Sequence, residues 1–211
     1  LPGQLLYGYT PRWPDTPHHL RGRPTTTQVV DDDLLIHTNY QLAKIYKAQR
    51  NWKEALDYYN KVYKVRAPRN IQLDTRFDIS QILMEKRQWK EAYPHLIYLE
   101  RNWRGEEHHP EVLWRLIRVE LKRHRKWKAC RWARRLYSKY PAHPIIYDWG
   151  IDLQEAPMDG EKLGCLASEY DMIRRLQRLQ WAGETARAKR ELEILASRAG
   201  ENQYEIDRMQ S

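Results

Sequence analysis

The stretch Arg50-Asn51-Trp52-Lys53-Glu54-Ala55-Leu56 decides the fold, because it recurs as Arg87-Gln88-Trp89-Lys90-Glu91-Ala92-Tyr93. Five of the seven residues are identical, and the two copies lie 37 positions apart. A third copy reads Arg125-Lys126-Trp127-Lys128-Ala129-Cys130, and a weaker fourth reads Gly183-Glu184-Thr185-Ala186-Arg187-Ala188. Self-similarity at such a spacing is typical of stacked helical hairpins.

The residues around each copy have the helical period. An apolar face precedes the turn, and a matching stripe that starts with a small residue follows it. In the four copies these residues are Leu42, Ala43 and Tyr46 with Ala55, Tyr59 and Val62; Ile79, Ser80 and Leu83 with Ala92, Leu96 and Leu99; Leu116 and Ile117 with Ala129, Ala133 and Leu136; and Leu176 and Leu179 with Ala188, Leu192 and Leu195. The small residue lets two helix backbones approach closely. Pro68 and Pro141 are expected to end the second helices of the first and third copies.

This pattern resembles the tetratricopeptide repeat (TPR), whose period is about 34 residues. The match is degenerate, since the small residue of the first helix is Ala43, then Ser80, then Ile117. The longer spacing implies longer loops between hairpins. The resemblance predicts an all-α fold of stacked helical hairpins that form a TPR-like solenoid. The alternative is an irregular all-helical domain without true repeats.

The pattern divides the chain into four parts. Residues 1–33 hold five prolines, so we expect an extended Pro-rich N-terminal arm, with a disordered tail as the alternative. Residues 34–143 form three TPR-like hairpins, 144–199 a short helix plus a fourth helical hairpin, and 200–211 a polar tail. The run Asp31–Asp33 is expected to cap a helix that starts near Leu34 or, less simply, to bind a cation. Since the first residue is Leu1, we expect either that the natural start has been removed or that the chain is a segment of a longer protein.

Composition and motifs exclude several classes of protein. The chain has 211 residues, of which 41% are hydrophobic and 31% charged, which excludes collagen-like, low-complexity and fully disordered chains. No apolar run approaches the ~18 residues of a membrane span. The sequence contains no glycine-rich phosphate loop, no HExxH zinc motif and no nucleophile elbow. We therefore predict no catalytic residue, no cofactor and no metal site in this chain.

The two cysteines lie 35 positions apart, about one repeat. Cys130 falls on a second helix and Cys165 opens a later one, so the two could be neighbours in the stack. A disulfide would require an oxidising compartment. We favour the other interpretation, in which both are buried thiols that act as small apolar residues.

The positive charge is concentrated in one hairpin. The formal net charge is +9, and the segment from Val112 to Tyr140 holds eleven basic residues against Glu120 alone. The candidate surface for an anionic ligand comprises Arg115, Arg118, Lys122, Arg123, Arg125, Lys128, Arg131, Arg134 and Arg135, with the aromatic residues Trp127 and Trp132. Such a surface attracts an anionic polymer, and its aromatic rings could stack on sugars or bases. The alternative is a solvated face with the Trp rings buried between helices.

The segment from Met172 to Leu192 resembles the last helical hairpin of soluble lytic transglycosylases. In that family a basic helix with alternating Leu leads to an aromatic residue, a short polar turn and an Ala-Arg helix ahead of the catalytic domain. The resemblance implies a periplasmic, murein-associated protein with a non-catalytic superhelix. The catalytic motifs of the family (Glu-Ser, Gly-Leu-Met-Gln and Ala-Tyr-Asn-Ala-Gly) are absent from this chain, so no catalytic role is carried over.

Three functions therefore compete. The leading hypothesis is the scaffold segment of a lytic transglycosylase-like protein that binds or steers anionic peptidoglycan strands or a partner protein. The second is a general TPR adaptor for protein–protein interaction. The third and weakest is a nucleic-acid-binding helical repeat driven by residues 112–140.

Overall fold

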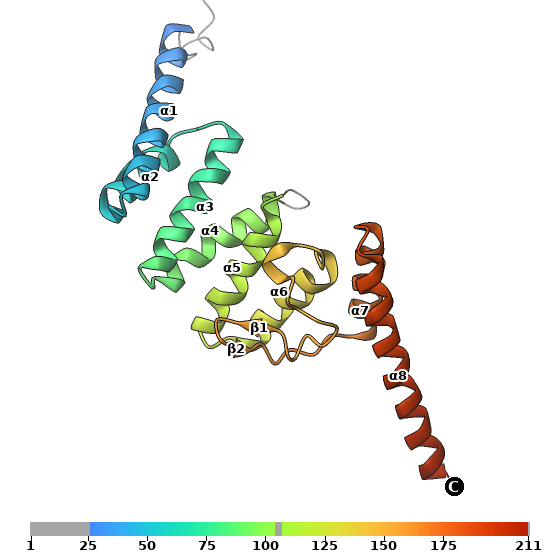
Figure 1. The fold of residues 1–211 in the computed structure, drawn as a ribbon. Helices are drawn as coiled ribbons and strands as arrows, with labels where there is room; N and C mark the ends of the chain where they lie inside the picture. Colours follow the sequence, from blue (N-terminus) through green and yellow to red (C-terminus); the bar gives the residue numbers. More distant parts are fainter. Residues whose placement is uncertain (1–25, 104–106, 211) are drawn as a thin grey trace, which may run out of the picture.

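The all-α fold is confirmed by a computed structural model, which describes residues 26–103 and 107–210 (Figure 1). The helices in this part of the chain are α1 (Thr26–Ala48), α2 (Trp52–Lys64), α3 (Arg69–Glu85), α4 (Trp89–Asn102), α5 (His109–Lys122), α6 (Lys126–Lys139), α7 (Glu169–Trp181) and α8 (Thr185–Gln210). They pair as the hairpins α1–α2, α3–α4, α5–α6 and α7–α8, and each hairpin packs on the next, as expected of a helical solenoid (Figure 1). A short 3₁₀ helix, η2 (Pro144–Ile146), and an antiparallel pair of strands, β1 (Pro157–Met158) and β2 (Glu161–Lys162), lie between α6 and α7.

The turn inside each hairpin has the same backbone geometry. A residue with positive φ follows each first helix, namely Arg50 (58°), Arg87 (58°), His124 (55°) and Gly183 (81°). The next amide donates to a carbonyl five residues back, at 2.8–2.9 Å in all four turns, as in a Schellman motif. The first three turns are 37 positions apart and the fourth follows 59 positions later. The larger gap accommodates residues 141–168, which we call the insert.

The second-helix stripes predicted for the first three hairpins are part of the core. Ala55, Tyr59 and Val62 of α2 have no exposed surface, and neither do the matching residues of α4 and α6. Ala129, rather than its neighbour Cys130, is the small buried residue of α6. In the fourth hairpin Leu192 is 56% exposed, because no further hairpin packs on it within the described residues. Each fully buried Leu contributes about 1.5–3 kcal/mol relative to an exposed one.

The predicted arm is wrong for residues 26–33, which belong to α1. Pro24 is the last proline before Pro68, so every residue between them can donate its backbone N–H to a helix. Asp31–Asp33 consequently lie within the helix and do not cap it at Leu34. The remainder of the predicted arm, residues 1–25, lies outside the described part of the chain.

Residues 200–210 of the predicted polar tail are helical, because α8 continues to Gln210. No proline interrupts this stretch, and a helix already twelve or more residues long is extended at little cost. In Figure 1 the second half of α8 projects well past α7.

A disulfide joins Cys130 of α6 to Cys165 of the insert, with the Cα atoms 5.3 Å apart. The interpretation as two separate buried thiols is therefore wrong. Sequence alone did not indicate that the insert folds back onto α6, which brings the two residues together. Cys165 precedes α7 by several residues and is almost fully buried.

No helix in residues 26–103 and 107–210 combines the length and apolarity needed to cross a bilayer.

Candidate ligand-binding grooves

A groove of about 630 Å³ lies between the first two hairpins, and we call it the N-terminal groove. It is formed mainly by α1 and α3, the first helices of their hairpins. It is lined by Tyr40, Lys44, Lys47, Ala48, Arg50, Trp52, Asp74, Phe77, Asp78, Gln81, Glu85, Trp103 and His108. Most of its cations come from α1 and the following turn, and its acids come from α3, so a ligand meets both signs of charge.

Two carboxylates on α3 are already hydrogen-bonded inside the groove. Asp78 accepts from Lys47 at 2.5 Å and from the Tyr59 hydroxyl at 2.6 Å, while Asp74 accepts from Tyr40 at 3.4 Å. Burial, followed by the charges of Asp74 and Asp78, raises the pKa of Tyr40, and the pKa of Tyr59 is raised by burial and by Asp78. Both hydroxyls therefore remain donors throughout the physiological range. Burial also raises the pKa of Asp74 above its ordinary value.

Aromatic rings form the floor of the groove. Phe77 meets Trp103 edge-on at 5.4 Å between ring centroids, and Trp103 lies 5.1 Å from His108. Behind them the guanidinium of Arg115 stacks on Phe77 at 3.7 Å and donates to Glu111 at 2.6 Å. This predicted ligand residue is therefore nearly buried and supports the floor of the groove. Its burial lowers the pKa of the guanidinium.

A second, more basic depression of about 440 Å³ lies at the turns of the second and third hairpins, and we call it the turn notch. Its lining residues are Arg87, Gln88, Trp89, Lys90, Glu91, Lys122, Arg123, His124 and Arg125. Three of the predicted ligand residues thus meet two cations of the preceding hairpin. An adjoining hollow of about 550 Å³ shares Arg87, Trp89 and Lys122 with the notch and adds Arg118.

Two of the predicted cations near the notch already interact with other residues of the chain. Arg123 stacks on Tyr93 at 4.4 Å and lies 3.5 Å from the buried Glu120. Arg118 donates to Asp159 of the insert at 3.1 Å. Lys122 and Arg125 are exposed and make no ion pair within the described residues.

The rest of the predicted surface lies on α6. Trp127, Arg131 and Arg134 are exposed along one face, which we call the α6 strip, and Lys128 is half-buried beside Trp127. Arg135 is paired with the buried Glu100. Trp132 is 8% exposed, so its ring packs inside the protein and is not free to stack on a ligand. The structure therefore divides the predicted residues among the notch, the α6 strip and the core.

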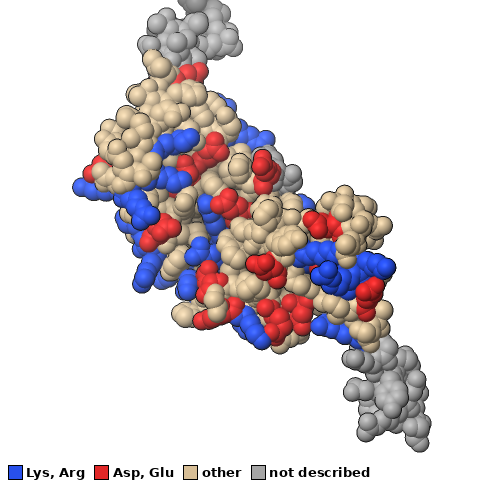
Figure 2. Space-filling model, in the orientation of Figure 1, with Lys and Arg blue, Asp and Glu red and all other residues tan. Residues whose placement is uncertain are grey.

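Acidic side chains lie among the basic ones on the face shown in Figure 2. Asp159 of the insert pairs with Arg118, and Glu111, just before residue 112, pairs with Arg115. Both acids lie outside residues 112–140 and neutralise part of the positive charge of that segment. The excess of charge read from residues 112–140 is thus partly compensated in three dimensions.

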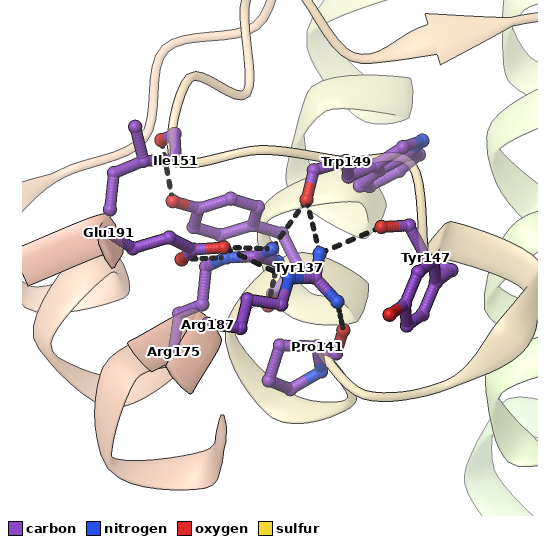
Figure 3. A network of polar contacts seen from close by, with 8 residues as sticks. All are labelled: Tyr137, Pro141, Tyr147, Trp149, Ile151, Arg175, Arg187 and Glu191. Carbon is purple, nitrogen blue, oxygen red and sulfur yellow. Dashed lines mark hydrogen bonds and ion pairs between the residues drawn. The ribbon is translucent and has the colours of Figure 1, made fainter. Parts of the chain in front are cut away.

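A third polar cluster joins the last hairpin to the third one, and we call it the clasp (Figure 3). Arg175 of α7 has no exposed surface and donates to both carboxylate oxygens of Glu191, at 2.8 and 3.0 Å, and to the Trp149 carbonyl at 2.5 Å. Arg187 of α8 donates to Glu191 at 3.2 Å and to carbonyls of the insert, including that of Trp149 at 2.7 Å. Arg175 and Glu191 are buried and their polar atoms are paired, so the clasp fixes the insert in place.

The residues of the N-terminal groove were not predicted, because the candidate surface was chosen from the run of basic residues at 112–140. A signal was nevertheless present, since Tyr40, Phe77 and Trp114 are aromatic and 37 positions apart, each ten residues before a left-handed turn residue. We call this the aromatic groove position. One turn further along, Lys44, Gln81 and Arg118 form a polar groove position with the same spacing.

No group of three or more His, Cys, Asp or Glu side chains in the described ranges is arranged to hold a metal ion. Comparison with protein-family models, with curated proteins and with solved structures gives no match to this chain. These comparisons therefore do not link the chain to TPR proteins or to lytic transglycosylases.

Proposed function

We propose that this chain is a non-catalytic, TPR-like scaffold that binds a segment of a partner protein in the N-terminal groove. The observation that carries the proposal is the groove itself, with its aromatic floor and its walls of opposite charge. A solenoid suits this role because each first helix adds a strip to one extended surface. The internal pairs Asp78–Lys47 and Asp74–Tyr40 pre-organise the walls, which lowers the entropic cost of binding.

Panning a random phage-displayed peptide library against the full chain tests this function. The variant Gln81→Trp fills the groove, and Asn60→Trp, at an exposed position of α2, is the matched control. We expect clones that bind the wild type and the control and lose binding to Gln81→Trp. If no clone is enriched, or if the enriched clones bind all three proteins equally, the proposed function is wrong.

A second candidate is binding of anionic peptidoglycan at the turn notch, as expected of a murein-associated scaffold in the periplasm. Two observations favour it: the convergence of cations from two hairpins in the notch, and the Cys130–Cys165 disulfide, which is typical of proteins in oxidising compartments. Nucleic acid remains the alternative ligand for the same cations.

Co-sedimentation with purified murein sacculi tests the second candidate, with a single-stranded oligonucleotide as the competing ligand. The variant Lys122→Glu/Arg125→Glu alters the notch, and Arg131→Glu/Arg134→Glu alters the α6 strip by the same charge. We expect the notch variant to lose sedimentation and the strip variant to retain it. Binding to the oligonucleotide in place of sacculi would support the nucleic-acid alternative, and binding to neither would remove both.

A further inference from the structure

The insert of the same chain covers part of the groove face of the third hairpin. At the aromatic groove position, Trp114 contacts the ring of Trp149 with 6.1 Å between centroids. At the polar groove position, Arg118 donates to the carboxylate of Asp159 at 3.1 Å. A space of about 230 Å³ remains beside Trp114 and the insert, and Arg118 also borders the hollow of about 550 Å³ described above.

The insert is held firmly in this place. Trp149 is 1% exposed, and its indole N–H donates to the Pro157 carbonyl at 3.1 Å. The disulfide at Cys165 and the clasp on the Trp149 carbonyl anchor its two ends. The third groove face is therefore filled by an aromatic ring and a carboxylate that are part of the fold.

The same two positions are open in the first hairpin. Tyr40 and Lys44 stand where Trp114 and Arg118 stand in the third hairpin, and both line the N-terminal groove. Lys44 is exposed, with its ammonium 5.6 Å from the centre of the Tyr40 ring, and it makes no ion pair within the described residues. Phe77 and Trp103 add aromatic surface beside Tyr40.

The charges of the groove favour an acid at Lys44. Asp78 is paired with Lys47, and Asp74 accepts a hydrogen bond from the Tyr40 hydroxyl, while Glu85 lines the same groove without an ion pair in the described part of the chain. Lys44 and Arg50 are the cations of α1 and its turn that lack one in the described part of the chain. An incoming carboxylate beside Tyr40 therefore finds Lys44 without an ion pair, whereas Asp78 is already paired with Lys47.

We infer that the N-terminal groove recognises an extended segment of a partner protein in which an aromatic residue and an acidic residue are separated by one position. The aromatic ring would lie against Tyr40 and Phe77, and the carboxylate would pair with Lys44. Residues four apart on α1 are separated by about 6 Å along the helix axis. Residues two apart on an extended chain face the same side and are about 6.8 Å apart, so this spacing spans both positions. The inference rests on the proposed function and specifies its ligand.

Fluorescence polarisation of labelled seven-residue peptides with the full chain tests the inference. The probes are Gly-Ser-Trp-Gly-Asp-Ser-Gly, its Asp-to-Lys form and its Trp-to-Ala form. We expect the wild type to bind the Trp-Gly-Asp peptide about three- to tenfold more tightly than either other peptide, as one exposed ion pair and one aromatic contact allow. Lys44→Glu should reverse the preference toward the Trp-Gly-Lys peptide, whereas Lys53→Glu, an exposed change on α2 with the same charge, should leave it unaltered.

Equal binding of the three peptides, no binding of any, or an unchanged preference in Lys44→Glu would overturn the inference. The proposed function fails separately. If library panning yields peptides that need an open groove but lack the aromatic and acidic pair, the groove still binds a partner and only its stated ligand is wrong.

Discussion

The junction between the first two hairpins and the junction between the last two join hairpins that contain the same left-handed turns and the same backbone hydrogen bonds. They differ in what covers the groove face of the first helix. At the first junction Tyr40 and Lys44 line an open groove, while at the last junction Trp114 and Arg118 lie under the insert. A repeat fold thus supplies equivalent positions several times, and the chain itself has filled one set and left another free.

The two junctions also differ in how they are held together. The N-terminal junction relies on buried apolar stripes and on Asp78 with Lys47 and Tyr59. The C-terminal junction adds the clasp and a disulfide. Among the side chains that the structure describes, the last hairpin has fewer buried apolar residues, and on α7 the buried residues are Leu179 and Arg175. Polar and covalent links therefore compensate for a thinner core.

Breaking the clasp should have the largest effect. Glu191→Ala leaves the buried guanidinium of Arg175 without its carboxylate, so we expect unfolding free energy to fall by about 3–5 kcal/mol. The exposed Glu193, on the same helix, gives the matched control Glu193→Ala, with a change within about 0.5 kcal/mol. Urea unfolding measures both. Similar values for the two variants would show that the clasp does not hold the last hairpin.

Removing the disulfide should come next. Cys130→Ser with Cys165→Ser releases the insert from α6, and closing a loop of this length contributes about 2–4 kcal/mol. We expect faster backbone hydrogen exchange in residues 148–165 with little change in α1 to α4. Exchange that rises equally in both halves would mean that the insert and the N-terminal junction are not independent.

Enlarging a small buried residue tests the close helix packing that all the hairpins share. Ala92 of α4 has no exposed surface, so Ala92→Leu should cost about 1–3 kcal/mol by forcing neighbouring helices apart. The exposed Ala48→Leu on α1 is the control. A wild-type melting temperature for Ala92→Leu would contradict the stacking register.

Lowering the pH should weaken the N-terminal junction selectively, and we expect this to be the smallest of the four effects. Burial, followed by the nearby Arg76, lowers the pKa of His95 from 6.5 to about 4, and its ring meets Tyr63 of α2 at 5.8 Å. The unfolded chain therefore binds a proton that the folded chain does not, and stability falls as pH decreases from about 6.5 toward 4. Between pH 7 and 5 we expect a loss of about 1 kcal/mol, reduced from the full linkage value because the ring is only partly buried. In His95→Gln this part of the pH dependence should be absent. A urea midpoint with the same pH dependence in both proteins would contradict the assignment.

Helical periodicity and repeated Trp, Lys and Ala residues were enough to predict the hairpins, the stripes and the turns. These features are local, and each needs only a few consecutive residues. The insert could not be predicted, since its position depends on Arg175, Arg187 and Cys130, which come from three different helices. Arg175 in particular reads as one more cation of a basic helix, yet it is buried against Glu191.

The candidate site was predicted less well for a related reason. Charge counted along residues 112–140 ignores the acids that reach it from elsewhere, such as Asp159 at Arg118. Groove residues are instead marked by their repeat position, as Tyr40, Phe77 and Trp114 are. The position of a residue in the repeat is therefore a better guide to which residues line the N-terminal groove than a count of charge.

Hydrogen–deuterium exchange of the full chain, with and without the Trp-Gly-Asp peptide, tests the central claim most directly. The N-terminal groove is open and the third groove face is filled, so added peptide should slow exchange in residues 40–52 and 74–85 and leave α7 and the insert unchanged. Slowed exchange confined to the insert or to α5 to α8, or none anywhere at saturating peptide, would contradict the account.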